Sequence, residues 1–348
     1  MMRIAVTGAT GNVGTSLLAR LAANDRVDEV VGIARRPPEV AVPKVRWVGA
    51  DTADDDLRPH LEGADAVVHL AWLFQPTHRP VVTWRANVIG SERVFAAAAD
   101  VRVGAVVHAS SVGAYSPAPG RVVDESWPTH SLPTAAYGRE KAYVECILDT
   151  FERRHPDVRV VRLRPGFIFQ RPAATAQRRL FLGPLVPNLV ARRGRLPFVP
   201  LPAGLRFQAL HADDAAEAFH TAVMSAASGP FNIAAAPVID HDVLADLLGT
   251  RVVSVPRPVL RAGLAAAWHS HLVPTEPALL DLVLDLPLLD TTRATRELGW
   301  SPRTTGPEAV RELLDGMAAG AGRPTAPLAP DSAAGRAGEL AGGIGERP

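Results

Sequence analysis

A phenol and an ammonium group lie one helical turn apart near the middle of the chain. Tyr137 and Lys141 have the i, i+4 spacing that places two side chains on one face of a helix. An unperturbed tyrosine has a pKa of about 10, too high for a base at neutral pH, and a nearby cation lowers that pKa. The pair therefore predicts a general acid/base suited to a carbonyl and its alcohol.

A hydroxyl precedes this pair at the end of an expected strand. The strand 105–110 is followed directly by Ser111. Because the carboxyl ends of parallel strands face the ligand crevice, we expect Ser111 to hydrogen-bond the substrate oxygen that Tyr137 protonates. Alone, Tyr137 and Lys141 would be read as an ordinary surface pair. Together with Ser111 and the glycine turn described next, they favour catalysis.

The chain begins with a short apolar strand, 3–7, that leads into a glycine-rich turn and then a helical pattern at 15–23. Glycines let backbone N–H groups approach a pyrophosphate, and a helix N-terminus attracts its charge. The spacing is G-x-x-G-x-x-G, and a purely structural turn is the alternative. We expect a dinucleotide site whose contacts come from Gly8, Thr10, Gly11, Asn12, Val13 and Gly14.

The end of the second expected strand bears on the choice of cofactor. It reads Gly32-Ile33-Ala34-Arg35-Arg36, with no carboxylate at the place where one would bind the adenosine ribose diol. Guanidinium groups there favour the 2′-phosphate of NADP, through charge-assisted hydrogen bonds. We therefore prefer NADP, and NAD remains open because Arg35 and Arg36 could be surface residues of an arginine-rich chain.

Elements that would position these groups alternate between strand and helix over the first two-thirds of the chain. This alternation predicts an α/β fold with a doubly wound parallel (Rossmann) sheet and a smaller C-terminal substrate-binding subdomain. We assign residues 1–168 to the NAD(P)-binding domain, with 208–234 returning to it, and 169–207 and 235–317 to the subdomain. Residues 318–348 are rich in Gly, Ala and Pro and predict a disordered tail. The expected strands are 3–7, 30–34, 45–49, 66–71, 105–110 and 159–164.

Composition limits the classes of partner. The 348 residues carry a formal net charge of +1, which gives no reason to expect a nucleic-acid or membrane partner. One cysteine, Cys146, fits a reducing compartment, and with no long apolar run or leader pattern we expect a cytoplasmic protein. His269 and His271 lack a further ligand at metal spacing, so we expect no metal site.

The order of these motifs resembles that of extended short-chain dehydrogenase/reductases, the NAD-dependent epimerase/dehydratase family, over residues 3–315. Besides the glycine turn, the resemblance rests on Asp51 and on the segments 66–71, 87–91, 163–166, 211–215 and 297–302. It implies that Ser111, Tyr137 and Lys141 form the catalytic triad, with Lys141 also holding the nicotinamide ribose. It further implies cofactor contacts from Asp51, Leu70, Ala71, Asn87 and Pro165.

The resemblance implies an NAD(P)-dependent oxidoreductase or epimerase that acts on a small molecule, with a homodimer as a further expectation. Val112 and Gly113 replace the Asp-Glu pair of the family's dehydratases, so dehydration is not expected. The segment 167–170 lacks the asparagine with which sugar-nucleotide epimerases hold a diphosphate. Two alternatives stay open: a nucleotide-sugar epimerase with retained NAD, and a non-catalytic NADP-binding regulatory protein. Arginines that could bind a phosphorylated substrate, or lie on the surface, are Arg178, Arg179, Arg192, Arg193, Arg195 and Arg206.

Overall fold

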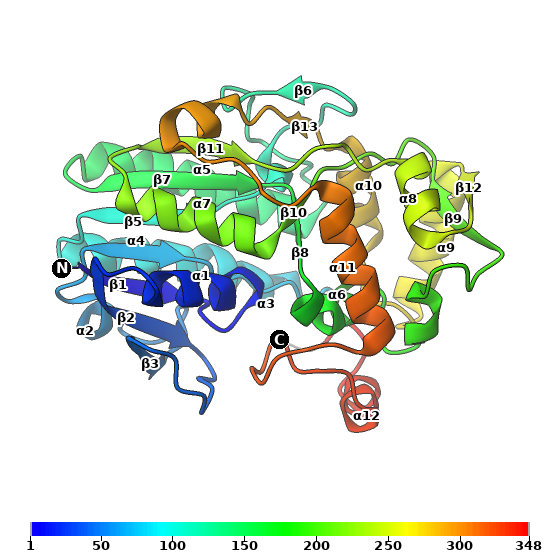
Figure 1. Cartoon of the computed structure of the whole chain (residues 1–348), viewed down its shortest axis with the longest axis horizontal. Coiled ribbons are helices and arrows are strands. Elements are labelled where there is room, and N and C mark those ends of the chain that lie inside the picture. The colour runs from blue at the N-terminus through cyan, green and yellow to red at the C-terminus, as the bar shows by residue number, and fades with distance from the viewer. Residues whose placement is uncertain (1, 347–348) are drawn as a thin grey trace.

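A seven-stranded parallel sheet forms the centre of the computed structural model, which describes residues 2–346 (Figure 1). Its strand order is β11-β7-β5-β4-β1-β2-β3, with helices on both faces. The predicted doubly wound α/β fold is confirmed, and the strand bounds are β1 Met2–Thr7, β2 Val27–Ala34, β3 Val45–Gly49, β4 Ala66–His69, β5 Ala105–Ala109, β7 Arg159–Pro165 and β11 Gly229–Ile233.

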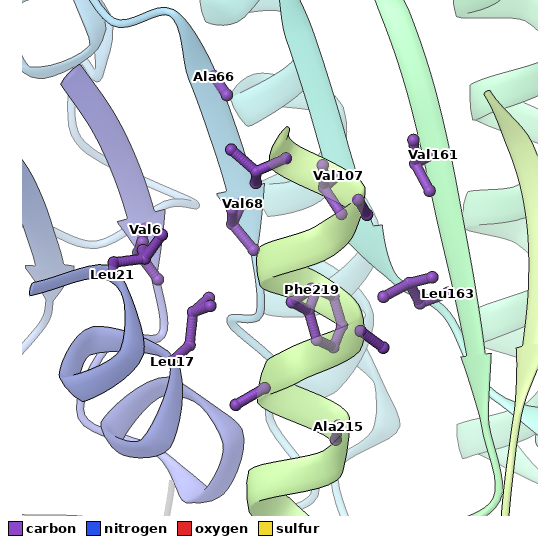
Figure 2. Packing of buried hydrophobic residues seen from close by; sticks show 14 of the residues in the cluster. Val6, Leu17, Leu21, Ala66, Val68, Val107, Val161, Leu163, Ala215 and Phe219 are labelled. Atoms are coloured by element: carbon purple, nitrogen blue, oxygen red, sulfur yellow. The ribbon is translucent and has the colours of Figure 1, made fainter. Parts of the chain in front are cut away.

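Helices cover both faces of the sheet. On one face, α1 (Asn12–Ala22) and α7 (Ala212–Met224) bury Leu17, Leu21 and Phe219 against the strands (Figure 2). On the other, α4 (Gly90–Asp100) and α5 (Ala136–Arg154) supply a second apolar cluster. Burying one such large apolar side chain stabilises the fold by about 1.5–3 kcal/mol. The two clusters therefore fix the sheet edge from which the catalytic candidates extend.

The C-terminal part lies beyond the carboxyl ends of the strands (Figure 1). Outside the main sheet, the described residues form short parallel pairs β8–β10, β9–β12 and β6–β13. The pair β6–β13 joins residues 122–123 to residues 288–289. β11 joins the main sheet beside β7, whereas the domain boundaries themselves stay a prediction. The remaining strands are β6 Val122–Val123, β8 Phe167–Phe169, β9 Phe198–Pro202, β10 Ala209–His211, β12 Arg251–Val255 and β13 Leu288–Leu289. The remaining helices are α2 Arg58–Leu61, α3 Pro80–Trp84, η1 Arg85–Ile89, η2 Val112–Ala114, η3 Arg171–Ala173, α6 Ala174–Phe181, η4 Asn188–Ala191, α8 His241–Leu248, α9 Arg257–His269, α10 Pro277–Asp285, η5 Ala294–Leu298, α11 Gly306–Ala319 and α12 Ala333–Ala341.

Among the described helices, none combines the length and the apolar character needed to span a bilayer.

The segment predicted as a disordered tail differs in the structure, where it forms α12 and packs against α6. The Arg178 guanidinium, 2% exposed, pairs with Glu339 at 3.0 Å and with Asp331 at 3.5 Å. Arg336 also pairs with Asp331, at 2.8 Å. The prediction was based on the low content of large apolar residues, whereas these ion pairs, together with the buried side chain of Leu328, hold the segment in place. The structure thus describes residues 318–346 as packed chain, whereas the tail boundary itself stays a prediction and residues 347–348 lie outside the described part.

Removing the partner of a buried guanidinium tests this anchoring. Glu339→Ala is expected to lower the free energy of unfolding by about 2 kcal/mol, because Arg178 stays buried with weaker acceptors. The matched control is Glu346→Ala, whose partner Arg79 is largely exposed, and its cost is expected to stay below about 0.5 kcal/mol. Urea unfolding measures both. Equal costs for the two variants would contradict the buried role of Glu339.

Candidate active site

The glycine turn after β1 is too tight for side chains. Gly8 has φ +68°, and a Cβ there would lie 2.6 Å from the amide nitrogen of Ala71. A Cβ on Gly14 would lie 2.4 Å from the carbonyl oxygen of Gly8. Such distances cannot be accommodated without moving backbone, so both positions require glycine.

Backbone donors at the start of α1 fit a pyrophosphate. Gly11 is the N-cap of α1 and makes no side-chain hydrogen bond to the first turn of the helix. The backbone amides of that turn and the helix dipole are thus arranged to bind an anion. Asn12 is directed elsewhere: its side chain donates to the carbonyl of Ile168 at 3.0 Å and accepts from Gln170 at 2.9 Å. Val13 packs on the core below the turn.

The tail reaches the same turn. The hydroxyl of Thr325 donates to the carbonyl oxygen of Thr10 at 3.0 Å. A segment expected to be disordered therefore forms part of the surroundings of the predicted cofactor site.

The residues predicted to select the cofactor lie at neighbouring strand ends. Arg35 and Arg36 follow β2 and are exposed, and Asp51 follows β3, which pairs with β2 in parallel. The Asp51 carboxylate accepts from the amide of Ala53 at 2.9 Å, which fixes its loop. The structure thus brings these three side chains to one edge of the sheet. Their contacts with a cofactor stay a prediction.

Ser111 and Tyr137 lie in hydrogen-bonding contact. The Tyr137 hydroxyl donates to Ser111 Oγ at 2.9 Å, and Ser111 Oγ also accepts from the amide of Gly113 at 2.9 Å. Ser111 comes just after β5, whereas Tyr137 lies in the first turn of α5. These two residues, 26 positions apart in the sequence, are thus in contact, one at the end of a strand and the other at the start of a helix.

Lys141 lies one turn further along α5 and is 4% exposed. Its ammonium donates to the carbonyl oxygen of Ala109 at 2.6 Å and lies 3.4 Å from the ring centroid of Trp72. A cation over an indole face is stabilised by the ring quadrupole. The charge is thus held against the last residue of β5, beside Ser111.

Burial dominates the electrostatics of the pair. It raises the pKa of Tyr137 to about 12, although the hydrogen bond with Ser111 acts in the opposite direction. It also lowers the pKa of Lys141 to about 7, against the opposing charges of Glu145 and Glu140. The expected lowering of the phenol pKa is therefore wrong for this structure, because loss of solvent outweighs the hydrogen bond with Ser111. The phenol is held in its protonated form.

An aromatic wall faces the pair, and sequence reasoning missed it. We use this name for Trp72, Leu73 and Phe74, which follow β4. The Phe74 ring stacks on that of Tyr137, with centroids 5.0 Å apart, and Trp72 meets Tyr137 edge-on at 5.9 Å. A tryptophan and a phenylalanine just past a strand's carboxyl end, where ligands bind, were the signal that could have found them.

Leu70 and Ala71, predicted to contact the cofactor, connect β4 to this wall. The amide of Leu70 donates to the carbonyl of Thr7 at 3.1 Å, so the segment passes beside the glycine turn. Pro165 ends β7 and is buried at the same edge of the sheet. The structure therefore places Leu70 and Ala71 beside the glycine turn, whereas Pro165 lies at the end of β7, with β5 and β4 between that strand and β1. The cofactor contacts of all three stay a prediction.

Asn87 is buried and bonded to protein groups. Its Oδ1 accepts from the amide of Leu73 at 2.7 Å, and its Nδ2 donates to the carbonyl of Leu73 at 2.8 Å and to Glu140 at 2.6 Å. These bonds hold the aromatic wall. The cofactor contact implied for Asn87 stays a prediction.

A second buried ion pair fixes α5 on the sheet. Glu145 accepts from two nitrogens of Arg164 at 2.9 Å each. Burial favours the neutral acid, but the hydrogen bonds and charge of Arg164 outweigh it and lower the pKa of Glu145 to about 2. Because Arg164 belongs to β7, this pair sets how the helix that carries Tyr137 and Lys141 sits on the strands.

Over residues 2–346, histidine, cysteine, aspartate and glutamate side chains form no group of three or more arranged to hold a metal ion.

Relatives in sequence extend over most of the chain. It is 30% identical over 347 aligned positions to a 4-hydroxy-2-methyl-3-oxo-4-farnesyl-3,4-dihydroquinoline-1-oxide ketoreductase of Stigmatella aurantiaca, covering 92% of this chain and 98% of that protein. It is 29% identical over 315 residues to an uncharacterized protein of Mycobacterium tuberculosis. That match covers 90% of this chain, which spans only 30% of the length of the mycobacterial relative.

Solved structures share the fold. UDP-glucose 4-epimerase of Thermus thermophilus in complex with NAD superposes with a TM-score of 0.67 at 21% identity, over 91% of this chain and 99% of that one. dTDP-glucose 4,6-dehydratase of Streptomyces venezuelae with NAD bound gives 0.67 at 20% identity, over 90% and 96%. A family model described as "NAD dependent epimerase/dehydratase family" matches residues 4–234. With its Rossmann sheet and glycine turn, the chain belongs to this family.

Proposed function

We propose that the chain is an NAD(P)-dependent oxidoreductase of the Ser-Tyr-Lys type that works on a carbonyl or secondary alcohol of a small molecule. The observation that carries the proposal is the contact between the Tyr137 hydroxyl and Ser111 Oγ at 2.9 Å, with the ammonium of Lys141 on the adjoining carbonyl of Ala109. The acid (Tyr137), the orienting hydroxyl (Ser111) and the cation (Lys141) thus lie together where β5 ends and α5 begins.

In reduction, the roles of the three side chains follow from their protonation. A nicotinamide dinucleotide, when bound, supplies the hydride to the carbonyl carbon. The phenol of Tyr137, whose pKa is raised to about 12, is protonated and gives its proton to the carbonyl oxygen, which becomes a hydroxyl. Ser111 orients that oxygen, and Lys141 offsets the negative charge left on the phenol oxygen.

The cofactor site fits a dinucleotide, and we propose NADP. The glycine turn leaves no room for a Cβ, and α1 offers amides for the pyrophosphate. Exposed guanidinium groups at positions 35 and 36 suit a 2′-phosphate. NAD is the alternative, because the epimerase and dehydratase structures of similar fold are NAD complexes.

The surroundings of Tyr137 favour reduction of an apolar ketone over epimerisation of a nucleotide sugar. Trp72 and Phe74 contact Tyr137, and Phe181 of α6 meets Phe74 edge-on with centroids 5.8 Å apart. Arg178, a candidate for a substrate phosphate, is instead paired with the chain's own carboxylates. The ketoreductase relative, aligned over nearly its full length, supports the same choice. A nucleotide-sugar epimerase with retained NAD is the second candidate.

Removing the phenol oxygen tests the acid. Tyr137→Phe is expected to lower kcat for NADPH-dependent reduction of an aromatic diketone such as phenanthrenequinone by roughly 100-fold to 10,000-fold, with NADPH affinity retained. The matched control is Tyr143→Phe on the same helix, where the ring is half exposed and the rate is expected to stay unchanged. If Tyr137→Phe keeps its full rate, Tyr137 is not the acid, and a non-catalytic regulatory protein becomes the better account.

Cofactor selection can be measured by titration. Replacing Arg35 and Arg36 together by serine is expected to raise the Kd for NADPH at least about tenfold, because charge-assisted bonds to the 2′-phosphate are lost. The Kd for NADH, which lacks that phosphate, is expected to stay within a factor of about two. Equal weakening of both, or of neither, would rule out this role for the two arginines.

The lowered pKa of Lys141 predicts a pH dependence. Lys141 carries its charge below pH 7 and loses it above, so kcat/KM, which reports the free enzyme, is expected to fall as the pH rises through about 7. Lys141→Arg keeps the charge at every accessible pH and is expected to flatten this fall, at a lower overall rate. The expected fall in kcat/KM between pH 6 and 9 is on the order of tenfold. A wild-type profile without this fall would refute a role for the ammonium.

A further inference from the structure

A buried carboxyl group, that of Glu140, lies between Tyr137 and Lys141 in the sequence of α5 and has no role in the chemistry above. Glu140 is 1% exposed, and such a side chain is almost never fully buried unless it is paired. One oxygen accepts from the Thr83 hydroxyl at 2.6 Å, and the other accepts from Asn87 Nδ2 at 2.6 Å. Both partners lie outside α5, on α3 and η1.

The bond to Asn87 continues to the aromatic wall. Asn87 holds both backbone groups of Leu73, and the neighbours of Leu73 are the two rings that contact Lys141 and Tyr137. In the described chain, residues 70–76 form neither helix nor strand. Their position therefore depends on these side-chain bonds rather than on a regular backbone ladder.

We infer that Glu140 is a positioning residue, which through Asn87 holds the aromatic wall against Tyr137 and Lys141. The inference rests on the proposed function in that it concerns the same site. The physical reason lies in the side-chain amide of Asn87. Its oxygen and one of its two N–H donors are bonded to Leu73, so the second N–H donor needs a buried acceptor, and Glu140 supplies it.

A purely electrostatic role for Glu140 is the rival account. Its carboxylate is close enough to act on Lys141, and Arg139 and Glu276 also act on Glu140. Glu276 and Glu140 line one cavity of about 30 Å³, beside Tyr137 and Phe74. If the charge mattered, neutralising Glu140 would disturb the site even when every hydrogen bond was kept.

Glutamine separates the two accounts, because the Thr83 hydroxyl can reverse its role. That hydroxyl lies 3.0 Å from the carbonyl of Pro80 and can donate there while accepting from a glutamine amide. The glutamine oxygen then still accepts from Asn87. Glu140→Gln thus keeps the bonds and removes the charge, whereas Glu140→Ala removes both.

The experiment compares these variants in the full chain by hydrogen–deuterium exchange over residues 71–75 and by steady-state kinetics. Glu140→Ala is expected to speed exchange of the Leu73 amide about tenfold and to raise KM for NADPH, whereas Glu140→Gln stays within about twofold of wild type. Glu276→Gln is the matched control, a neutralised carboxyl of the same cavity without a bond to Asn87, and is expected to leave exchange unchanged.

Two outcomes would overturn the inference: Glu140→Gln as impaired as Glu140→Ala, or no faster exchange at Leu73 in Glu140→Ala. Should Glu140→Ala not fold, Glu140→Met fills a similar volume without a carboxyl oxygen for Asn87, and unchanged exchange at Leu73 in that variant would also overturn it. Exchange needs no turnover. A wild-type protein without reductase activity would therefore sink the proposed function and leave the role of Glu140 to be decided by exchange alone.

Discussion

The burial of one ammonium group is the constraint on which the site depends. Lys141 is 4% exposed, and withdrawing a charge from water costs several kcal/mol unless nearby groups compensate it. Here the carbonyl of Ala109 and the face of Trp72 do so directly, while Glu140 and Glu145 act through their charge. β5, the segment after β4, and α5 must therefore meet at this point, and the phenol one turn earlier is enclosed with it.

That enclosure decides which chemistry the site suits. A phenol whose pKa is raised by burial is a proton donor, as reduction of a carbonyl requires. The rings that exclude water also make the surroundings apolar, which suits a ketone more than a sugar diphosphate. Membership of the NAD dependent epimerase/dehydratase family admits both reactions. The choice between them thus rests on the wall and on the pairing of Arg178 within the chain, which the fold alone does not determine.

Sequence reasoning succeeded where the information was local. The i, i+4 spacing of Tyr137 and Lys141 and the strand end before Ser111 sufficed to predict that the three would meet, and alternating patterns predicted the sheet. It failed where contacts join distant segments. Arg178 and Glu339 are 161 positions apart, and the bond between Asn87 and Glu140 joins residues 53 apart. The direction of the Tyr137 pKa shift was mispredicted because it is set by burial, which follows from packing and not from the i, i+4 spacing.

The most direct test of the central claim is to heat-denature the purified protein, identify any nicotinamide nucleotide that is released, and titrate nucleotide-free protein with NADPH and NADH. A reductase that exchanges its cofactor is expected to release little nucleotide and to bind NADPH more tightly than NADH. Stoichiometric release of NAD(H) would contradict this and indicate the internal redox cycle of an epimerase. Failure to release or bind either dinucleotide would contradict the whole account of the site.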